Sequence, residues 1–268
     1  MLYQLSDLHL FDDPQASYRG ANVQANLDRC LAYLKTRLKA EDTLIVTGDL
    51  CQHDNEMAYM RLAQQLSQLT AQVAWIPGNH DATEPMLAAG EAFGIVTQAN
   101  AELVVDEHWR VILLHTNDLP DGRGGSGIKP CHLAKLQAQL ASPSPLHTLI
   151  ALHHPFLPVG CPWQDDMMLS NAEALLSCLE QTDQPIKLIA GHVHGYHRIE
   201  HKHLELITSP ATSVQFDPNS DTLAVREQGP LALPGVMAYQ LDSSGGWQPQ
   251  YIAIDEGAQG WPQPLGLL

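Results

Sequence analysis

Residues 45–50 read IVTGDL and residues 75–81 read WIPGNHD, and each joins a short apolar run to a polar exit. A glycine stands directly before Asp49 and before Asn79, as expected where a chain leaves a strand, turns tightly and approaches a ligand closely. In an open α/β sheet, ligands collect at the carboxyl ends of the strands. The two stretches therefore predict strands whose ends carry the chemistry of the protein.

Apolar runs of this kind alternate with amphipathic stretches along much of the chain, a pattern typical of an α/β fold with parallel strand pairs. The predicted strands are residues 2–5, 43–46, 73–76, 111–114, 148–152, 187–190 and 204–208. The predicted helices are residues 23–40, 56–69, 133–140 and 171–179. After Tyr196 the sequence offers strands but no helical pattern, and we expect antiparallel hairpins there that complete a sheet.

The chain of 268 residues is long enough to bury one large α/β core or two smaller ones. It contains no linker-like segment, internal repeat or low-complexity tract, and its polar strand exits extend from residue 7 to residue 194. We therefore expect a single domain over residues 1–268. Residues 1–195 would form its functional core, and the strands of residues 196–268 would complete it.

The formal net charge is −16, with only 14 lysines and arginines, which weighs against nucleic acid and acidic membranes as partners. An acidic protein that handles phosphate needs a local source of positive charge, and a bound metal can supply it. The 14 histidines equal the lysines and arginines together. Composition alone leaves metal ligation and a chance abundance of surface histidines equally open.

No apolar run approaches the ~18 residues of a membrane span, and the first residues lack the basic start and apolar region of an export signal. We therefore expect a cytoplasmic protein. Its five cysteines are an odd number without a C-x-x-C pair, which favours reduced thiols over disulfides or a zinc cluster.

Histidines and an aspartate follow three further predicted strands. These residues are Asp7 and His9, His153 and His154, and His192 and His194. The i, i+2 spacing within the first and last pairs would place both side chains on one side of extended backbone. Each motif alone is weak evidence, but five of them at successive strand exits are hard to attribute to chance. Because clustered buried carboxylates and imidazoles without partners would cost several kcal/mol each, the cluster predicts compensating cations.

The residue types narrow the choice of metal. Aspartate oxygen, asparagine oxygen and histidine nitrogen without a thiolate suit Mn, Fe or Zn with open coordination positions. Two such ions about 3.5–4 Å apart need a bridging carboxylate. Asp49 is the best candidate for this bridge, because it is the only acidic residue of the set on a central strand.

In order along the chain, these motifs read D-x-H, GD, GNHD, a histidine, and GHVH, and they resemble the calcineurin-like metallophosphoesterase superfamily. The resemblance implies a four-layer α/β/β/α sandwich, the metallo-dependent phosphatase fold, with a binuclear centre. One ion would be held by Asp7, His9, Asp49 and His194, and the other by Asp49, Asn79, His153 and His192. His154 would lie outside the ligand set. Gln52 stands where protein Ser/Thr phosphatases carry a second aspartate, which speaks against phosphoprotein substrates.

Segments outside the metal motifs are similar to bacterial class III cyclic-nucleotide phosphodiesterases. They include HHPFLPVGCPW at residues 153–163 and SPATSVQFDPNSDTLAV at residues 209–225. The resemblance implies hydrolysis of a small phosphodiester, 3′,5′-cyclic AMP first. A phosphodiesterase for another small diester, such as a glycerophosphodiester, would share every ligand. A lipid-pathway pyrophosphatase would resemble GNRD rather than GNHD, and a non-catalytic scaffold would lose several of these residues.

The resemblance also implies residue roles. A hydroxide bridging the ions would attack phosphorus in line, and His80 would donate a proton or hydrogen bond to the leaving 3′-oxygen, oriented by Asp81 or a neighbouring acid. His80 and Asp49 are thus the catalytic candidates. The candidates for substrate contact are His9, Asp49, Asn79, His80 and His194. A purely structural His80 that fixes its loop remains the alternative.

The sequence does not decide the roles of three further residues. Arg19 and Arg123 are candidates for contacting a nucleotide phosphate or base, although most surface arginines contact nothing. Trp163 could line a substrate pocket or belong to the core. In residues 121–130, DGRGGSGIKP, the phosphate-loop pattern is not met and we expect a plain turn.

Overall fold

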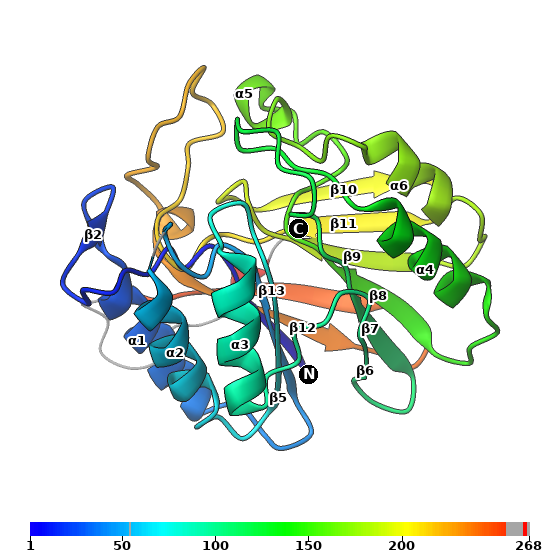
Figure 1. Ribbon diagram of the computed structural model, residues 1–268, viewed down its shortest axis with the longest axis horizontal. Helices are drawn as coiled ribbons and strands as arrows, with labels where there is room; N and C mark the ends of the chain where they lie inside the picture. Colours follow the sequence, from blue (N-terminus) through cyan, green and yellow to red (C-terminus); the bar gives the residue numbers. More distant parts are fainter. Residues whose placement is uncertain (54, 256–264, 267–268) are drawn as a thin grey trace.

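The computed structural model describes residues 1–53, 55–255 and 265–266 (Figure 1). Within this part of the chain the main strands form two six-stranded sheets. In spatial order the first sheet contains β14 (Leu265–Gly266), β13 (Trp247–Ala253), β12 (Gly235–Leu241), β1 (Leu2–Leu5), β4 (Thr43–Thr47) and β5 (Gln72–Ile76). The second contains β10 (His197–His201), β11 (Leu204–Thr208), β9 (Ile186–Ala190), β8 (His147–Ala151), β7 (Trp109–Leu113) and β6 (Glu102–Val104).

Short helices and one small hairpin complete the described fold. The helices are α1 (Val23–Lys35), α2 (Glu56–Leu66), α3 (Thr83–Phe93), α4 (Pro130–Ala141), α5 (Pro162–Asp165), α6 (Ala172–Leu179) and the 3₁₀ turn η1 (Pro230–Ala232). The hairpin pairs β2 (Ser17–Tyr18) with β3 (Ala21–Asn22). All seven strands expected from the sequence are present, each within two residues of its predicted bounds.

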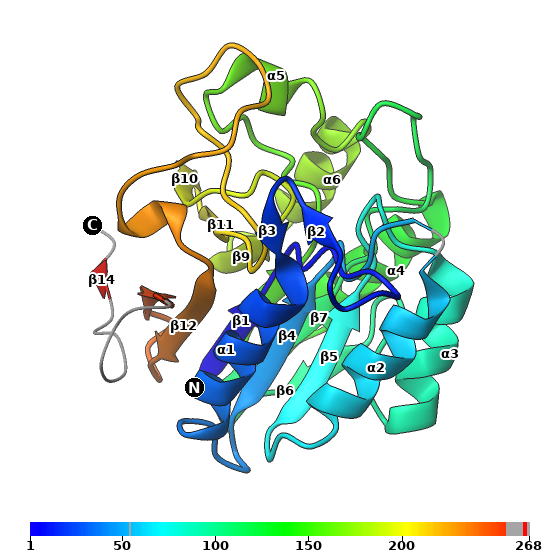
Figure 2. The ribbon, with the colours of Figure 1, turned by 90° about the vertical axis from the view of Figure 1, so that its left-hand side faces the viewer.

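The two sheets pack face to face, with helices on both outer surfaces. Leu2, Ile45, Val111 and Ile189 belong to one buried cluster that joins the inner faces of both sheets. A second cluster packs α1, α2 and α3 on the first sheet, and a third packs α4 and α6 on the second. Figure 2 shows α1, α2 and α3 covering β1, β4 and β5. The predicted four-layer α/β/β/α sandwich is confirmed.

The parallel pairs bring the strand exits to one edge. In the first sheet β1, β4 and β5 run parallel, and in the second β7, β8, β9 and β11 do so. Because parallel strands end on the same side, the polar segments after β1, β4, β5, β8 and β9 all emerge at a shared edge between the sheets.

Local sequence accounts for the helix bounds. The Asn22 side chain accepts a hydrogen bond of 2.8 Å from the Ala25 N–H and caps α1, which ends at Lys35, short of the expected residue 40. α2 likewise ends at Leu66 instead of 69. α3 was not expected, because its sequence contains Pro85 and Gly90, which weaken a helical pattern. Pro85 lies in the first turn, where no backbone donor is lost.

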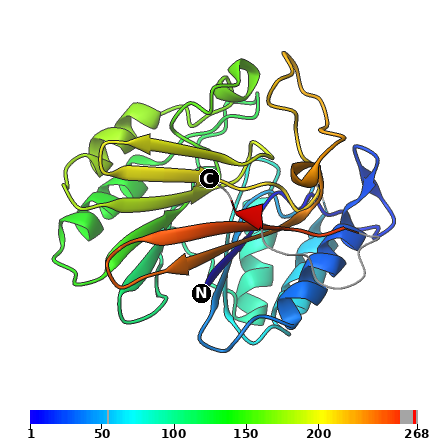
Figure 3. The same ribbon diagram turned by 180° about the vertical axis from the view of Figure 1, so that it is seen from behind.

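The chain after residue 196 forms hairpins, as expected. β10 and β11 pair antiparallel, as do β12 and β13, and β12 also pairs antiparallel with β1 (Figure 3). The C-terminal hairpin thus places the first strand inside its sheet. Among the described residues only the 3₁₀ turn η1 interrupts these strands with helix-like structure. No described helix is long and apolar enough to cross a membrane.

Candidate metal centre

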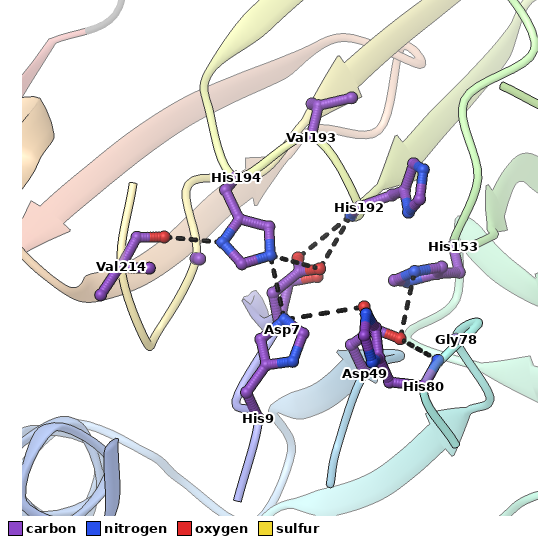
Figure 4. Close-up of polar contacts among 12 residues, drawn as sticks. Asp7, His9, Asp49, Gly78, His80, His153, His192, Val193, His194 and Val214 are labelled. Carbon is purple, nitrogen blue, oxygen red and sulfur yellow. Dashed lines mark hydrogen bonds and ion pairs between the residues drawn. The ribbon is translucent and has the colours of Figure 1, made fainter. Parts of the chain in front are cut away.

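The residues predicted at the strand exits converge between the two sheets (Figure 4). Two groups of side chains have ligand atoms that all lie within 4.8 Å of one another and could each hold a metal ion. The first group is Asp7, His9, Asp49 and His194. The second group is His153, His154 and His192. Six of these seven residues were predicted as ligands, with His192 and His194 at different ions, whereas His154 was expected to lie outside the ligand set.

The backbone is strained at all four residues of the first group and at His192 of the second. Positive φ angles in the left-handed region occur at Asp7 (54°), His9 (51°), Asp49 (51°), His192 (73°) and His194 (47°). The expectation of extended backbone at the two i, i+2 pairs is therefore wrong, although the side chains do converge. Left-handed conformations cost energy for residues other than glycine and tend to persist at functional sites, where the surroundings fix them.

Glycines allow the exit segments to approach one another closely. A Cβ atom on Gly78 would lie 2.2 Å from the Asp49 Oδ1, and one on Gly191 would lie 2.1 Å from the Ser6 Oγ. The close approach explains why glycine precedes Asn79 and His192. The His192 N–H donates to both oxygens of Asp7, at 3.0 and 3.1 Å, and so ties the second sheet to the first.

Three of the histidines point a bare nitrogen into the cluster. His153 and His194 donate from Nδ1 to the carbonyls of Thr47 and Val214, both at 2.7 Å, which leaves their Nε2 atoms unprotonated in the neutral form. His192 donates from Nε2 to the Met167 carbonyl at 3.0 Å, which leaves Nδ1 unprotonated. Backbone carbonyls thus fix the ring orientations, as is usual for metal-binding histidines.

These bare nitrogens face other acceptors. The His194 Nε2 lies 3.4 Å from the Asp7 Oδ1 and 3.0 Å from the His9 Nε2. The His153 Nε2 lies 3.2 Å from the Asn79 Oδ1 and 3.5 Å from the Asp49 Oδ1. Converging lone pairs repel one another unless a proton or a cation lies between them. The donor set therefore fits two metal ions, one at each group.

His154 differs from its neighbours. Its Nδ1 contacts the Thr116 hydroxyl at 2.9 Å and its Nε2 contacts the Gly124 carbonyl at 3.3 Å. Both ring nitrogens already have partners within the protein, and the ring is completely buried. The geometry therefore favours a packing and hydrogen-bonding role over ligation, in line with the prediction for this residue.

Burial and charge shift the pKa values of the cluster. Burial raises the pKa of Asp7 to about 7, with Asp49 adding to the rise and His153 opposing it. Burial lowers the pKa of His192 to about 3 and that of His194 to about 4. For His153, burial lowers the pKa, but the charges of Asp49 and Asp7 outweigh it and raise the value to about 9. A proton on His153 is thus stabilised by the two neighbouring carboxylates.

His80 lies at the open side of the cluster. Its backbone N–H donates to the Asp49 Oδ1 at 2.9 Å, and its ring lies 5.0 Å from the ring of His9. Its Nδ1 is buried without a hydrogen-bond partner in the described part of the chain. Burial lowers the pKa of His80, and the charge of Asp49 opposes this shift.

Asp81 does not orient His80. Its carboxylate accepts hydrogen bonds from the Gly78, Leu50 and Cys51 N–H groups and from the Tyr59 hydroxyl. It therefore clamps the segments after β4 and β5 together. Of the other candidates, Arg123 is exposed and lies beside Asp121, and Trp163 packs against Phe216 with ring centres 5.7 Å apart.

Three side chains that the sequence did not assign to the site contact its histidines. Tyr18 stacks on His9, and Phe216 stacks on His194. The Gln52 side-chain amide lies 2.8 Å from the His9 Nδ1. The sequence drew attention to Gln52 through its departure from the phosphatase motif and to Phe216 through the resemblance of residues 209–225. It did not indicate the aromatic contacts, because they join segments that are distant in the chain.

Comparison with known proteins identifies the family. The family model described as calcineurin-like phosphoesterase matches residues 2–196. The chain is 31% identical over 231 residues to the 3′,5′-cyclic adenosine monophosphate phosphodiesterase CpdA of Vibrio vulnificus (strain CMCP6), covering 85% of this chain and 82% of that protein. It is 29% identical over 246 residues to the enzyme of the same name from Escherichia coli (strain K12), covering 91% and 86%.

A solved structure, a dimetal phosphatase from Danio rerio, matches the fold with a TM-score of 0.58 at 15% identity, covering 88% of this chain and 91% of that one. At this identity the likeness concerns the fold alone. The family model, in contrast, spans most of the chain and every motif of the two groups. The chain therefore belongs to the calcineurin-like phosphoesterase family and is a phosphoester-hydrolysing enzyme.

Proposed function

We propose that this enzyme is a binuclear-metal phosphodiesterase that hydrolyses 3′,5′-cyclic nucleotides, converting cyclic AMP to 5′-AMP. The observation that carries the proposal is the place of Asp49 between the two groups. Its Oδ2 lies 3.6 Å from the His9 Nε2 and its Oδ1 lies 3.5 Å from the His153 Nε2. A carboxylate shared in this way is what a pair of adjacent ions requires.

In this proposal each group binds one ion. Asp7, His9, Asp49 and His194 would hold the first, and Asp49, Asn79, His153 and His192 would hold the second. The ions would be Mn or Fe, with Zn also compatible with oxygen and nitrogen ligands. Bound ions would supply two things: a lower pKa for water, from 15.7 to about 7, and compensation for the charge on the phosphoryl oxygens.

Part-exposed side chains of the protein would handle the substrate. Asn79 and His80 are partly exposed, unlike the buried residues behind them. His80 would donate a proton or hydrogen bond to the leaving 3′-oxygen, which fits its place as a partly exposed side chain beside Asp49. Donors of this kind typically contribute about 10²–10⁴-fold. His9, Asp49, Asn79 and His194 would lie against the phosphate.

The curated relatives support cyclic AMP over other diesters, since both are named for hydrolysis of that nucleotide. A glycerophosphodiester remains the second candidate, because it would use the same ligands. A non-catalytic scaffold is disfavoured, because all the predicted ligands and His80 are present and converge. A single domain over residues 1–268 and a cytoplasmic location belong to the same proposal.

A comparison of substrates tests this function. The purified protein loaded with Mn or Fe should convert 3′,5′-cyclic AMP to 5′-AMP faster, by kcat/KM, than it hydrolyses glycerophosphodiesters. The products are separated by chromatography, and a preparation stripped with a chelator is the control. Faster turnover of glycerophosphodiesters would overturn the proposal.

A further inference from the structure

Aromatic side chains cover the outer faces of two histidines of the first group. The ring centre of Tyr18 lies 4.3 Å from that of His9, at an interplanar angle of 11°. The ring centre of Phe216 lies 4.1 Å from that of His194, at 14°. Tyr18 belongs to the small hairpin of β2 and β3, whereas Phe216 lies in the loop between β11 and β12, so the two segments meet only in the folded protein.

Arg19 joins these two aromatic rings. Its guanidinium carbon lies 5.4 Å from the ring centre of Tyr18 and 5.5 Å from that of Phe216, within cation–π range of both. The side chain forms no ion pair with a carboxylate anywhere in the described chain. Its positive charge is therefore held by aromatic faces and remains available to a ligand.

The hairpin turn holds Arg19 in an unusual backbone conformation. Arg19 and Gly20, the two residues between β2 and β3, have φ angles of 48° and 88°. Turns with both central residues at positive φ favour Asn-Gly or Gly-Gly, and a long side chain at the first position is strained. Strain at this point suggests that the position is kept for the side chain rather than for the turn.

Arg19 also lies on the accessible side of the metal centre. The aspartates and histidines of both groups are at most 6% exposed, whereas Asn79, His80 and Tyr18 are partly exposed and Arg19 is exposed. These four residues are thus among those that a substrate can contact beside the centre. Figure 2 shows the β2–β3 hairpin beside the strand exits, next to the loop that carries Phe216.

We propose that Arg19, with Tyr18 and Phe216, is a specificity-determining element that holds the heterocyclic base of a nucleotide while its phosphate lies at the metal centre. Tyr18 and Phe216 each stack on one of the two histidines, and the Arg19 guanidinium contacts both aromatic rings. Arg19 is exposed, whereas His9 and His194 are at most 2% exposed, so a ligand group that extends from the ions toward solvent on this side meets the guanidinium.

This assignment rests on the proposed function and narrows it. The flat guanidinium of Arg19 can stack on any base, whereas it offers no stacking surface to a glycerol substituent and repels the positive charge of a choline substituent. The element would thus favour nucleotides over glycerophosphodiesters and would discriminate little between adenine and guanine.

Inhibition constants separate the two halves of the ligand. Turnover of bis(4-nitrophenyl) phosphate by the metal-loaded protein serves as the reporter, with 5′-AMP and inorganic phosphate as competitors. In Arg19→Ala we expect the Ki of 5′-AMP to rise on the order of tenfold and the Ki of inorganic phosphate to stay within about twofold of wild type. Arg19→Lys, which keeps the charge without the flat group, should recover only part of the loss.

Arg37→Ala is the matched control, since Arg37 makes a similar contact with Tyr33, 5.7 Å from its ring centre, on the remote end of α1. Unchanged melting temperatures confirm that the variants fold. An equal rise in the Ki of both competitors would overturn the proposal and show that Arg19 contacts the phosphate. Unchanged Ki values for both would also overturn it and show that Arg19 does not contact the ligand. Neither result depends on whether the wild-type protein hydrolyses cyclic AMP, which the comparison of substrates tests separately.

Discussion

The two groups of the metal centre are built differently. The first contains two carboxylates, and all four of its residues have left-handed backbone. The second contains only histidines, which the Asn79 amide and one shared oxygen of Asp49 approach, and His192 alone among its members has positive φ. The first group thus contains both carboxylates and most of the left-handed residues, and the second contributes no carboxylate of its own.

The difference has a consequence for metal loading. Coulomb attraction between a cation and two buried carboxylates is large, whereas the second group attracts an ion mainly through Asp49. We therefore expect the first group to bind its ion more tightly and the second to lose its ion first on dialysis. Four experiments test this difference in metal affinity, beginning with the substitution that should remove both ions.

Asp49→Asn should have the largest effect. It removes the charge that approaches His9 and His153 together, so both ions should be lost and kcat should fall on the order of 10³-fold or more. Metal analysis by mass spectrometry and steady-state kinetics measure this. Asp42→Asn, at a buried carboxylate that pairs with the N-terminus, is the control and should keep its metal. A metal-replete Asp49→Asn enzyme would contradict a bridging role.

His153→Gln should affect the second group alone. We expect loss of the weaker ion, retention of the other, and a decrease in kcat of roughly 10²-fold. His154→Gln is the matched control beside it, because both nitrogens of His154 bond within the protein. Measured metal content should fall in the first variant and stay unchanged in the second. The opposite result would exchange the roles of these adjacent histidines.

The metal-free protein should lose stability as pH rises from about 6.5 to about 9. The pKa of His153 is raised from 6.5 to about 9 on folding, so its stabilising contribution is complete below pH 6.5 and is lost as pH passes 9. The loss should be on the order of 2–3 kcal/mol. Urea unfolding of the chelator-treated protein at both pH values measures it. The metal-loaded protein should show a smaller loss, because an ion replaces that proton.

Gln52→Leu should have the smallest effect. The side-chain amide is the partner of the His9 Nδ1, and losing such a partner typically costs about 10–100-fold in metal affinity. We expect the low end, about tenfold, at the first group only. Gln64→Leu on the exposed side of α2 is the control. Titration with a metal-buffered indicator measures the metal affinity of both variants. Equal loss at both groups would show that Gln52 acts on the whole centre.

Much of this centre could be predicted from the sequence because each ligand follows a strand. Asp7, Asp49 and His153 follow apolar runs closely, and parallel pairing brings the ends of such strands together regardless of the helices between them. The left-handed backbone at Asp7 and His9 could not be predicted, because it depends on Gly48 and Asp49, whose carbonyls accept from these two residues.

Contacts between distant segments were also out of reach. Nothing near Phe216 indicates that its ring covers His194, and nothing near Asp81 indicates that its carboxylate joins the segments after β4 and β5. α3 was missed for a local reason, since Pro85 weakens the pattern while fitting the first turn of the helix. The sequence pattern predicts which polar residues each strand end carries. Which distant residues contact them depends on the packing of the folded chain.

The contacts of the late segments with β1 determine when the metal centre can be assembled during synthesis. Residues 212 and 213 donate backbone hydrogen bonds to Ser6 and Asp7, and the carbonyl of Val214 orients His194. The first strand to leave the ribosome therefore waits for some of the last residues made before its ligands are held in place. A nascent chain stopped near residue 196 would carry every predicted ligand and still lack these supports.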